Sequence, residues 1–280
     1  MRIRTKELCF SYGTTQVLKN MDFRAHESSL VAVIGPNGAG KSTLFRCILG
    51  FLKDYSGTIL IDNQDIKEMS RTEIARKIAY IPQTTVPVFN YDVIDIVLMG
   101  TTGSLKLLES PGKEQIEAAE RALDELGIGY LRNRGFGRIS GGERQLVLVA
   151  RALVQNAKIL IMDEPTNDLD TQTLAILEDY LDNYEGIVIT VSHDRYFLDR
   201  IARRIFAFEG NGRIVQYEGG YSDYMAKRPE PVKMGMSGST NEKNDIDESN
   251  GAEKEQTSSK QTWKHEKKVK FSYNEKREYE

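Results

Sequence analysis

A Gly-rich turn between a buried strand and a helix constrains this sequence more than any other feature. The apolar run Leu30–Ile34 is typical of a strand covered on both faces, and a helical pattern starts at Lys41. The turn between them, GPNGAGKST, fits the pattern G-x-x-x-x-G-K-[ST]. Its glycines let backbone N–H groups point inward, and the helix N-terminus adds partial positive charge. The segment is therefore predicted to bind phosphate groups within an α/β fold.

This turn supplies the first candidate binding residues. They are Gly35, Pro36, Asn37, Gly38, Ala39, Gly40, Lys41, Ser42 and Thr43. Lys41 is predicted to reach the β- and γ-phosphates of a nucleoside triphosphate, and Ser42 to bind Mg²⁺. A Gly-rich turn without a ligand is the alternative, and the strand before it and the helix after it disfavour that interpretation.

A second candidate element ends another buried strand. Four apolar residues, Ile159–Met162, precede Asp163 and Glu164. Partial burial of acidic side chains costs free energy, which a bound cation or a role in a reaction would offset. The alternative is that both acids are solvated at the end of the strand. Beside a phosphate-binding turn, Asp163 is predicted to complete the Mg²⁺ shell. Glu164 is predicted to orient or deprotonate the attacking water.

The hydrophobic pattern divides the chain into a folded part, 1–228, and a different C-terminal stretch. Strands and helices alternate over most of the folded part, after an antiparallel strand layer at Ile3–Tyr12 and Asn20–His26. Further strands are expected at Thr58–Ile61, Ile78–Ile81 and Ile187–Val191, and helices over Lys41–Leu49, Asp92–Leu126 with a break at Pro111-Gly112, Gly142–Ala152 and Arg195–Ile201. Residues 229–262 are rich in Ser, Asn, Glu, Lys and Gly, which predicts a disordered linker, and residues 263–280 form a basic, aromatic tail.

Composition excludes several classes of partner. The chain has 38 basic and 41 acidic residues and a net charge of -3, so no global field favours direct binding to DNA. It has neither a signal-peptide pattern at its start nor a run of about 20 apolar residues, so a cytoplasmic protein is expected. Cys9 and Cys47 lie in apolar stretches, which predicts two buried free thiols.

A third motif, Ile139–Glu143 with the sequence ISGGE, resembles the LSGGQ signature of ABC-type ATPases. Ser140 and both glycines match, whereas Ile139 and Glu143 stand where the commonest pattern has Leu and Gln. Ser140 followed by Glu143 is also a capping box. The two interpretations are compatible, because a helix N-terminus offering N–H groups is itself a phosphate binder.

The resemblance implies a RecA-like core, an antiparallel β subdomain and a helical subdomain at about 84–157, with Mg-ATP as the nucleotide. Tyr12 resembles the aromatic residue that stacks on adenine. Gln83 is similar to the glutamine that senses Mg²⁺ and the γ-phosphate, which makes it both a metal-site and a catalytic candidate. His193 resembles the switch histidine.

The same resemblance implies a partner. In the family, the signature of one cassette closes over the ATP bound by another, so a homodimer is expected. The residues that would act in trans are Ser140, Gly141, Gly142 and Glu143. ATP then holds the dimer together and hydrolysis releases it.

Two branches of the family are each similar to part of the chain. Residues 1–163 resemble the ATPase subunits of iron-siderophore, haem and cobalamin importers. These subunits dock on a membrane permease at the inner face of the plasma membrane. The matching segments are Ser70–Gln83, Val93–Gly100 and Ile139–Leu148. Residues 164–280 resemble ABC-F translation factors, which bind ribosomes; the matching segments are Glu164–Asp170, Val191–Asp199, Tyr217–Tyr224 and the tail 263–280. A composite or truncated chain is one interpretation, and a natural importer subunit with an unusual C-terminal half is the alternative. An orphan cassette with basal ATPase activity is a further interpretation.

Overall fold

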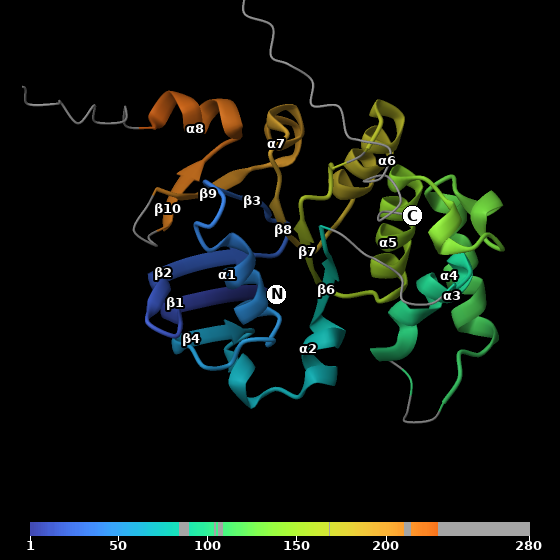
Figure 1. Cartoon of the computed structure of the whole chain (residues 1–280), viewed down its shortest axis with the longest axis horizontal. Coiled ribbons are helices and arrows are strands. Elements are labelled where there is room, and N and C mark those ends of the chain that lie inside the picture. Colours follow the sequence, from blue (N-terminus) through green and yellow to red (C-terminus); the bar gives the residue numbers. More distant parts are fainter. Residues whose placement is uncertain (84–89, 104, 106–108, 168, 210–213, 229–280) are drawn as a thin grey trace, which may run out of the picture. The chain divides into compact units, whose positions relative to one another are not determined.

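The fold contains two β-sheets (Figure 1). The structure is a computed structural model that describes residues 1–83, 90–103, 105, 109–167, 169–209 and 214–228. All of these lie in one compact unit, Met1–Glu230. The expected linker 229–262 and tail 263–280 lie outside the described residues, and the expected boundary at 228 stays a prediction.

The larger sheet has six strands in the order β10-β9-β3-β8-β7-β6 (Figure 1). All neighbouring pairs are parallel except β9 and β10, which are antiparallel. The strands are β3 (Leu30–Ile34), β6 (Ile78–Ile81), β7 (Ile159–Asp163), β8 (Ile187–Val191), β9 (Arg204–Phe208) and β10 (Ile214–Glu218). Because β3 and β7 lie in one parallel sheet, the turn after β3 and the acids after β7 emerge at the same edge.

The smaller sheet is antiparallel, with the order β2-β1-β4-β5. Its strands are β1 (Arg2–Tyr12), β2 (Thr15–His26), β4 (Ser56–Ile61) and β5 (Gln64–Asp65). The expected strand layer is confirmed, but β2 begins at Thr15 rather than Asn20. The β1–β2 pairing shifts register after Thr5, and Asn20 has a φ of 47°. This irregularity interrupts the alternation that marks a strand in the sequence.

Helices cover the larger sheet and form a lobe beside β6 (Figure 1). They are α1 (Lys41–Ile48), α2 (Arg71–Lys77), α3 (Val93–Leu98), α4 (Lys113–Glu125), α5 (Gly141–Val154), α6 (Thr171–Asp182), α7 (Arg195–Ile201) and α8 (Tyr221–Lys227), with 3₁₀ turns η1 (Ile66–Glu68), η2 (Met99–Gly103), η3 (Gly129–Leu131) and η4 (Phe136–Arg138). The break expected at Pro111-Gly112 is the start of α4, where Gly112 is the N-cap.

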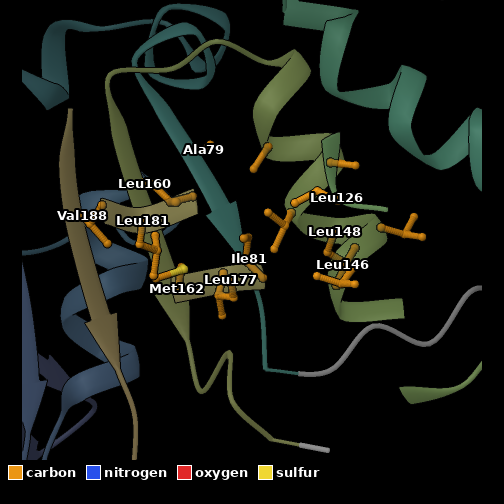
Figure 2. Close-up of a cluster of buried hydrophobic side chains, with 14 of the residues drawn as sticks. Ala79, Ile81, Leu126, Leu146, Leu148, Leu160, Met162, Leu177, Leu181 and Val188 are labelled. Atoms are coloured by element: carbon orange, nitrogen blue, oxygen red, sulfur yellow. The ribbon is translucent and has the colours of Figure 1, made fainter. Parts of the chain in front are cut away.

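Strand residues alternate between two hydrophobic cores. In β7, Leu160 and Met162 pack with α5 and α6 on one face, as Figure 2 shows for Leu148 and Leu177. Ile159 and Ile161 pack on the other face with α1 and the smaller sheet. This two-residue alternation fixes the register of β7, since a slip by one residue would exchange the two faces. Both faces are apolar, so only the strand ends are free to carry polar chemistry.

Two further expectations can be compared with the described residues. Cys9 and Cys47 are both free thiols, but only Cys47 is buried. The expectation for Cys9 was wrong, because its thiol lies 3.0 Å from Asn20 Oδ1 at the irregular part of the β1–β2 pair. No helix within the described ranges is long and apolar enough to cross a membrane.

Candidate functional site

The turn after β3 has the shape of an anion cradle. Gly38 and Gly40 have φ values of 78° and 110°, in the region that favours glycine. A Cβ on Gly40 would lie 3.0 Å from side-chain carbons of both Val17 and Leu18 in β2. Helix α1 follows at once, and its N-cap makes no side-chain hydrogen bond to the first turn. The first N–H groups of a helix lack partners within the helix, so this end suits a bound phosphate.

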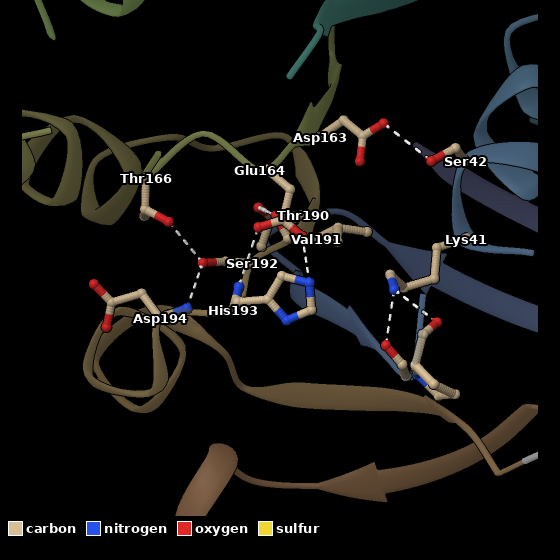
Figure 3. A network of polar contacts seen from close by, with 12 residues as sticks. Lys41, Ser42, Asp163, Glu164, Thr166, Thr190, Val191, Ser192, His193 and Asp194 are labelled. Carbon is tan, nitrogen blue, oxygen red and sulfur yellow. Dashed lines mark hydrogen bonds and ion pairs between the residues drawn. The ribbon is translucent and has the colours of Figure 1, made fainter. Parts of the chain in front are cut away.

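The Lys41 side chain lies in the cradle and is only 8% exposed. Its Nζ donates hydrogen bonds to the carbonyl oxygens of Gly35, at 2.7 Å, and Pro36, at 3.1 Å (Figure 3). Burial lowers the pKa of the Lys41 amine, and the nearby carboxylates of Glu164 and Asp163 oppose that shift. A buried ammonium gains from an anionic partner, which the phosphates of a nucleotide would provide.

Asp163 and Ser42 meet at the strand edge and form a set of hard oxygen ligands. Ser42 Oγ donates a hydrogen bond to Asp163 Oδ2 at 3.3 Å (Figure 3). Asp163 is 8% exposed, and burial raises the pKa of its carboxyl group. One carboxylate and one hydroxyl, completed by phosphate oxygens, fit the way proteins bind Mg²⁺ with ATP. Within the described residues, no group of three or more His, Cys, Asp or Glu side chains could hold a metal.

We predict that Asp163→Asn raises the thermal stability of the nucleotide-free chain at neutral pH. The folded-state pKa of Asp163 is raised, so its burial stabilises the fold only while the carboxyl is protonated, and that contribution is lost as pH rises through the folded pKa. Asn carries no charge to bury. The difference in Tm from wild type should shrink as pH is lowered from neutral towards the raised folded-state pKa of Asp163.

Thermal unfolding without nucleotide or Mg²⁺ measures this difference, and 1 kcal/mol corresponds to about 2–4 °C in Tm for a chain of this size. Asp179→Asn is the control, because Asp179 is an exposed carboxylate on α6. A lower Tm for Asp163→Asn at neutral pH would show that the hydrogen bonds to the carboxylate outweigh its burial.

Glu164 lies directly after β7 and contacts His193 twice. Glu164 Oε1 is 3.2 Å from His193 Nε2, and Oε2 accepts the backbone N–H of His193 at 3.1 Å (Figure 3). Glu164 is 6% exposed, and burial raises the pKa of its carboxyl group. A carboxylate with a raised pKa is a better proton acceptor at neutral pH, so the position suits a general base.

The backbone of Glu164 is also unusual. Its φ of 50° places a non-glycine residue in the left-handed region. Its N–H donates to the carbonyl of Val191 in β8 at 2.9 Å, which holds this conformation. Such conformations persist where the surroundings over-determine them, and they are concentrated at functional sites.

Gln83 and Tyr12 lie on segments that approach this site from two sides. Gln83 follows β6, where Ile81 pairs with Met162, so it leaves the sheet at the same edge as the acids of β7. Tyr12 ends β1 and is 45% exposed. Val17 and Leu18 of the same hairpin pack on Gly40 of the cradle. Both placements agree with the expected roles, which stay predictions.

The signature residues are not brought to this cluster within the chain. Ser140 caps α5: its Oγ accepts the Glu143 N–H at 3.2 Å, and Glu143 Oε2 accepts the Ser140 N–H at 2.7 Å. The expected capping box is therefore present. Gly141 and Gly142 form the first turn of α5, which packs on α3, α4, α6 and β6. The Tyr130 hydroxyl also donates to Glu143 Oε1 at 3.0 Å.

Three contacts around the site could not be predicted from the sequence. Burial, and next the nearby Asp163 carboxylate, raise the pKa of the Tyr80 phenol to about 12. Arg151 of α5 donates to the carbonyl of the same Tyr80 at 2.9 Å, and so joins the signature helix to β6. Thr166 and Ser192 share a hydrogen bond of 2.8 Å that ties the loop after β7 to the loop that carries His193 (Figure 3).

A parallel sheet with a phosphate cradle after one strand and paired buried carboxylates after another defines a P-loop nucleoside triphosphatase. The family model described as ABC transporter matches residues 18–167, and the chain belongs to this family. It is an ATP-binding, ATP-hydrolysing cassette, the ATP-binding subunit type of ABC transporters.

The relatives include transport ATP-binding proteins and a longer ATP-binding protein. The chain is 41% identical over 170 residues to an uncharacterized ABC transporter ATP-binding protein of Haemophilus influenzae, covering 61% of this chain and 65% of the relative. It is 37% identical over 221 residues to a probable iron chelatin transport ATP-binding protein of Helicobacter pylori, covering 77% and 87%. It is 32% identical over 237 residues to the ATP-binding protein Uup of Caulobacter vibrioides, covering 84% of this chain but 36% of the relative.

Solved structures share the fold. The structure of cbiO1 from Clostridium perfringens, part of the ABC transporter complex cbiONQ, superimposes with a TM-score of 0.69 at 27% identity and covers 80% of this chain and 90% of that chain. The expectation of an α/β P-loop NTPase with the ABC cassette fold is confirmed.

Proposed function

We propose that this chain energises the import of an iron chelate or a similar large cofactor, such as an iron-siderophore, haem or cobalamin, through a membrane permease. The observation that carries the proposal is the similarity to the iron chelatin transport protein of Helicobacter pylori, which spans 77% of this chain. In this proposal the protein is cytoplasmic and lies at the inner face of the plasma membrane when the permease holds it.

Each group of site residues has its own role in ATP hydrolysis. The cradle residues Gly35–Thr43 bind the triphosphate, with the Lys41 ammonium on the β- and γ-phosphates and Tyr12 on adenine. Mg²⁺, held by Ser42, Asp163 and Gln83, would neutralise charge on the transferred phosphoryl group. Glu164 accepts the proton of the attacking water, and His193 holds the Glu164 carboxylate in place through two contacts.

A second cassette completes the site. Within the chain, Ser140 and Glu143 at the start of α5 form hydrogen bonds with each other, and Glu143 also accepts one from Tyr130. Helix α5 packs in the helical lobe. In a two-fold homodimer, Ser140, Gly141, Gly142 and Glu143 of each copy would face the ATP of the other.

A matched pair of serines tests the action in trans. Ser70 and Ser140 form capping boxes with the same distances, 3.2 Å to the Glu N–H and 2.7 Å from the Ser N–H. Ser70→Ala and Ser140→Ala should each cost about 1 kcal/mol of stability, the usual value for a lost N-cap. Only Ser140→Ala should also lower the ATPase rate at saturating protein concentration. Equal ATPase rates in the two variants would contradict a role of Ser140 at the partner's nucleotide.

Apolar side chains beside α2 form the surface that we propose for the permease. Phe51 is 68% exposed and Met99 40% exposed. Gly50 lies against Ile74 of α2, and η2, which carries Met99, packs on the same helix. Exposed apolar side chains gathered at one place are typical of a protein–protein contact.

Co-purification from detergent extracts tests this surface. Phe51→Glu/Met99→Glu should lose an associated integral membrane protein and keep ATP binding. Val215→Glu/Met225→Glu is the matched control, because these side chains are 37% and 46% exposed on β10 and α8. Retention of the membrane protein by both double variants would exclude the proposed surface.

A ribosome-associated ABC-F-type role is the second candidate, and the similarity to Uup over 84% of this chain favours it. Under this alternative, the chain is a composite or part of an ABC-F factor, and residues 164–224 contact the ribosome. Salt-sensitive co-sedimentation with ribosomes, without a co-purifying permease, would support this role against import.

A further inference from the structure

The outer face of the smaller sheet carries a basic hollow that the nucleotide site does not use. Its volume is about 260 Å³, and its lining includes Arg2, Arg4, Arg24, His26, Asn63 and Leu60. We propose that this arginine hollow binds a small anion with two or more phosphate groups.

The strand register places the basic side chains face to face. Arg4 of β1 lies directly opposite Arg24 of β2, and Arg2 lies opposite His26. All four side chains are exposed, whereas Ile3 and Ala25 between them point into the core. Like charges directly opposite each other on a sheet are destabilising, so this pairing has a cost that a bound anion would remove.

The carboxylates nearest to the hollow bond to main-chain groups and not to its guanidinium groups. Among the described residues, the side chains of Arg2, Arg4 and Arg24 form no ion pair. Asp62 Oδ1 accepts the backbone N–H of Arg2 at 2.9 Å, and Glu27 pairs with the N-terminal amine at 2.8 Å. These acids are engaged with main-chain groups, so the guanidinium groups are available to a ligand from solution.

The chemistry of the lining selects phosphate. Guanidinium groups present planar pairs of N–H donors that match phosphate oxygens, and two facing arginines suit an anion with more than one phosphate. The hollow is smaller than the roughly 300–1,000 Å³ of pockets for drug-sized ligands, so it suits a compact anion. Leu60 is the partly exposed apolar residue of the lining, which offers little surface to a large organic group.

Calorimetric titration with inorganic tripolyphosphate in about 150 mM salt tests the proposal. The full chain is used with Lys41→Ala, so that the cradle after β3 does not contribute. We expect saturable binding with a Kd below roughly 1 mM. Arg4→Gln/Arg24→Gln should weaken it at least tenfold. The control Arg71→Gln/Arg121→Gln removes two exposed arginines on α2 and α4, and should change it less than twofold.

Three results would overturn the proposal. If both double variants weaken tripolyphosphate binding equally, or if no saturable binding is measured, the arginines form an ordinary solvated face of the sheet. Loss of binding to phosphatidylglycerol vesicles on Arg4→Gln/Arg24→Gln, without binding of tripolyphosphate, would assign the hollow to lipid headgroups instead of a free anion. The ATPase rate of Arg4→Gln/Arg24→Gln with an intact Lys41 should equal that of wild type, which shows that the variant is folded.

Discussion

Glu164→Gln should slow ATP hydrolysis by roughly 10²–10⁴-fold, the contribution expected of a positioned general base. Gln keeps the size of Glu164 and can still accept the His193 N–H that lies 3.1 Å from the carboxylate. It cannot accept a proton from water. ATP binding should persist, because the phosphate cradle after β3 is untouched. Two copies that cannot hydrolyse ATP should then stay associated.

Single-turnover hydrolysis and light scattering after gel filtration measure the two effects. The variant should run as a dimer at saturating Mg-ATP and as a monomer without nucleotide. Glu68→Gln, at an exposed position of η1, is the control and should behave as wild type. A Glu164→Gln chain that binds Mg-ATP and remains monomeric would count against the composite site.

The structure also shows which parts of the site a sequence can predict. The cradle is local: strand, turn and helix are consecutive, so its conformation follows from residues 30–49. Asp163 and Glu164 could be placed beside it because parallel strands end at the same edge of a sheet. Both predictions rest on continuous apolar runs, which are the strongest pattern for buried strands.

Contacts between distant segments could not be predicted in this way. Tyr80 is the half-buried residue of β6, and nothing local shows that its phenol lies near Asp163 or that Arg151 donates to its carbonyl. The strand β9 was also missed. Its last four residues form a buried apolar run like those of β3 and β7, so the pattern was present in the sequence.

The location of the signature motif shows a different limit of prediction from the sequence. Ser140 and Glu143 were predicted to form a capping box and to bind phosphate, and the box is present. Ser140 and Glu143 bond to each other, and Glu143 to Tyr130, so the phosphate that we propose they bind is that of a second copy. A single chain cannot show which surface of a second copy completes the site. Symmetry supplies that step, since a two-fold axis makes both halves equivalent.

Lys41→Ala should weaken ATP binding by roughly 30- to several-thousand-fold, equivalent to about 2–5 kcal/mol for a truncated partner of a buried charge pair. The Lys41 amine is nearly buried and is held by two carbonyl oxygens of the cradle. Burial lowers the pKa of this amine, so the buried ammonium carries a desolvation cost that a bound anion would offset. The triphosphate therefore gains a charge-assisted contact that the fold has already positioned.

The same reasoning separates loss of binding from loss of folding. Since burial of the Lys41 ammonium is unfavourable, removal of the amine should not lower the Tm of the nucleotide-free chain, and Lys41→Met, which keeps the aliphatic stem, should match or exceed wild type. Saturation of wild type with Mg-ATP at about 100 times Kd should stabilise it by about 2.7 kcal/mol, and both variants at the same nucleotide concentration should be stabilised by less than about 0.9 kcal/mol.

Lys227→Ala is the matched control for this experiment, because Lys227 Nζ also donates to a backbone carbonyl, that of Glu218 at 2.9 Å, outside the cradle. It should keep the full ATP-dependent rise in Tm. An undiminished rise in Lys41→Ala would remove Gly35–Thr43 from the nucleotide site. In that case the low exposure of Lys41 would have to be explained by its two carbonyl contacts alone.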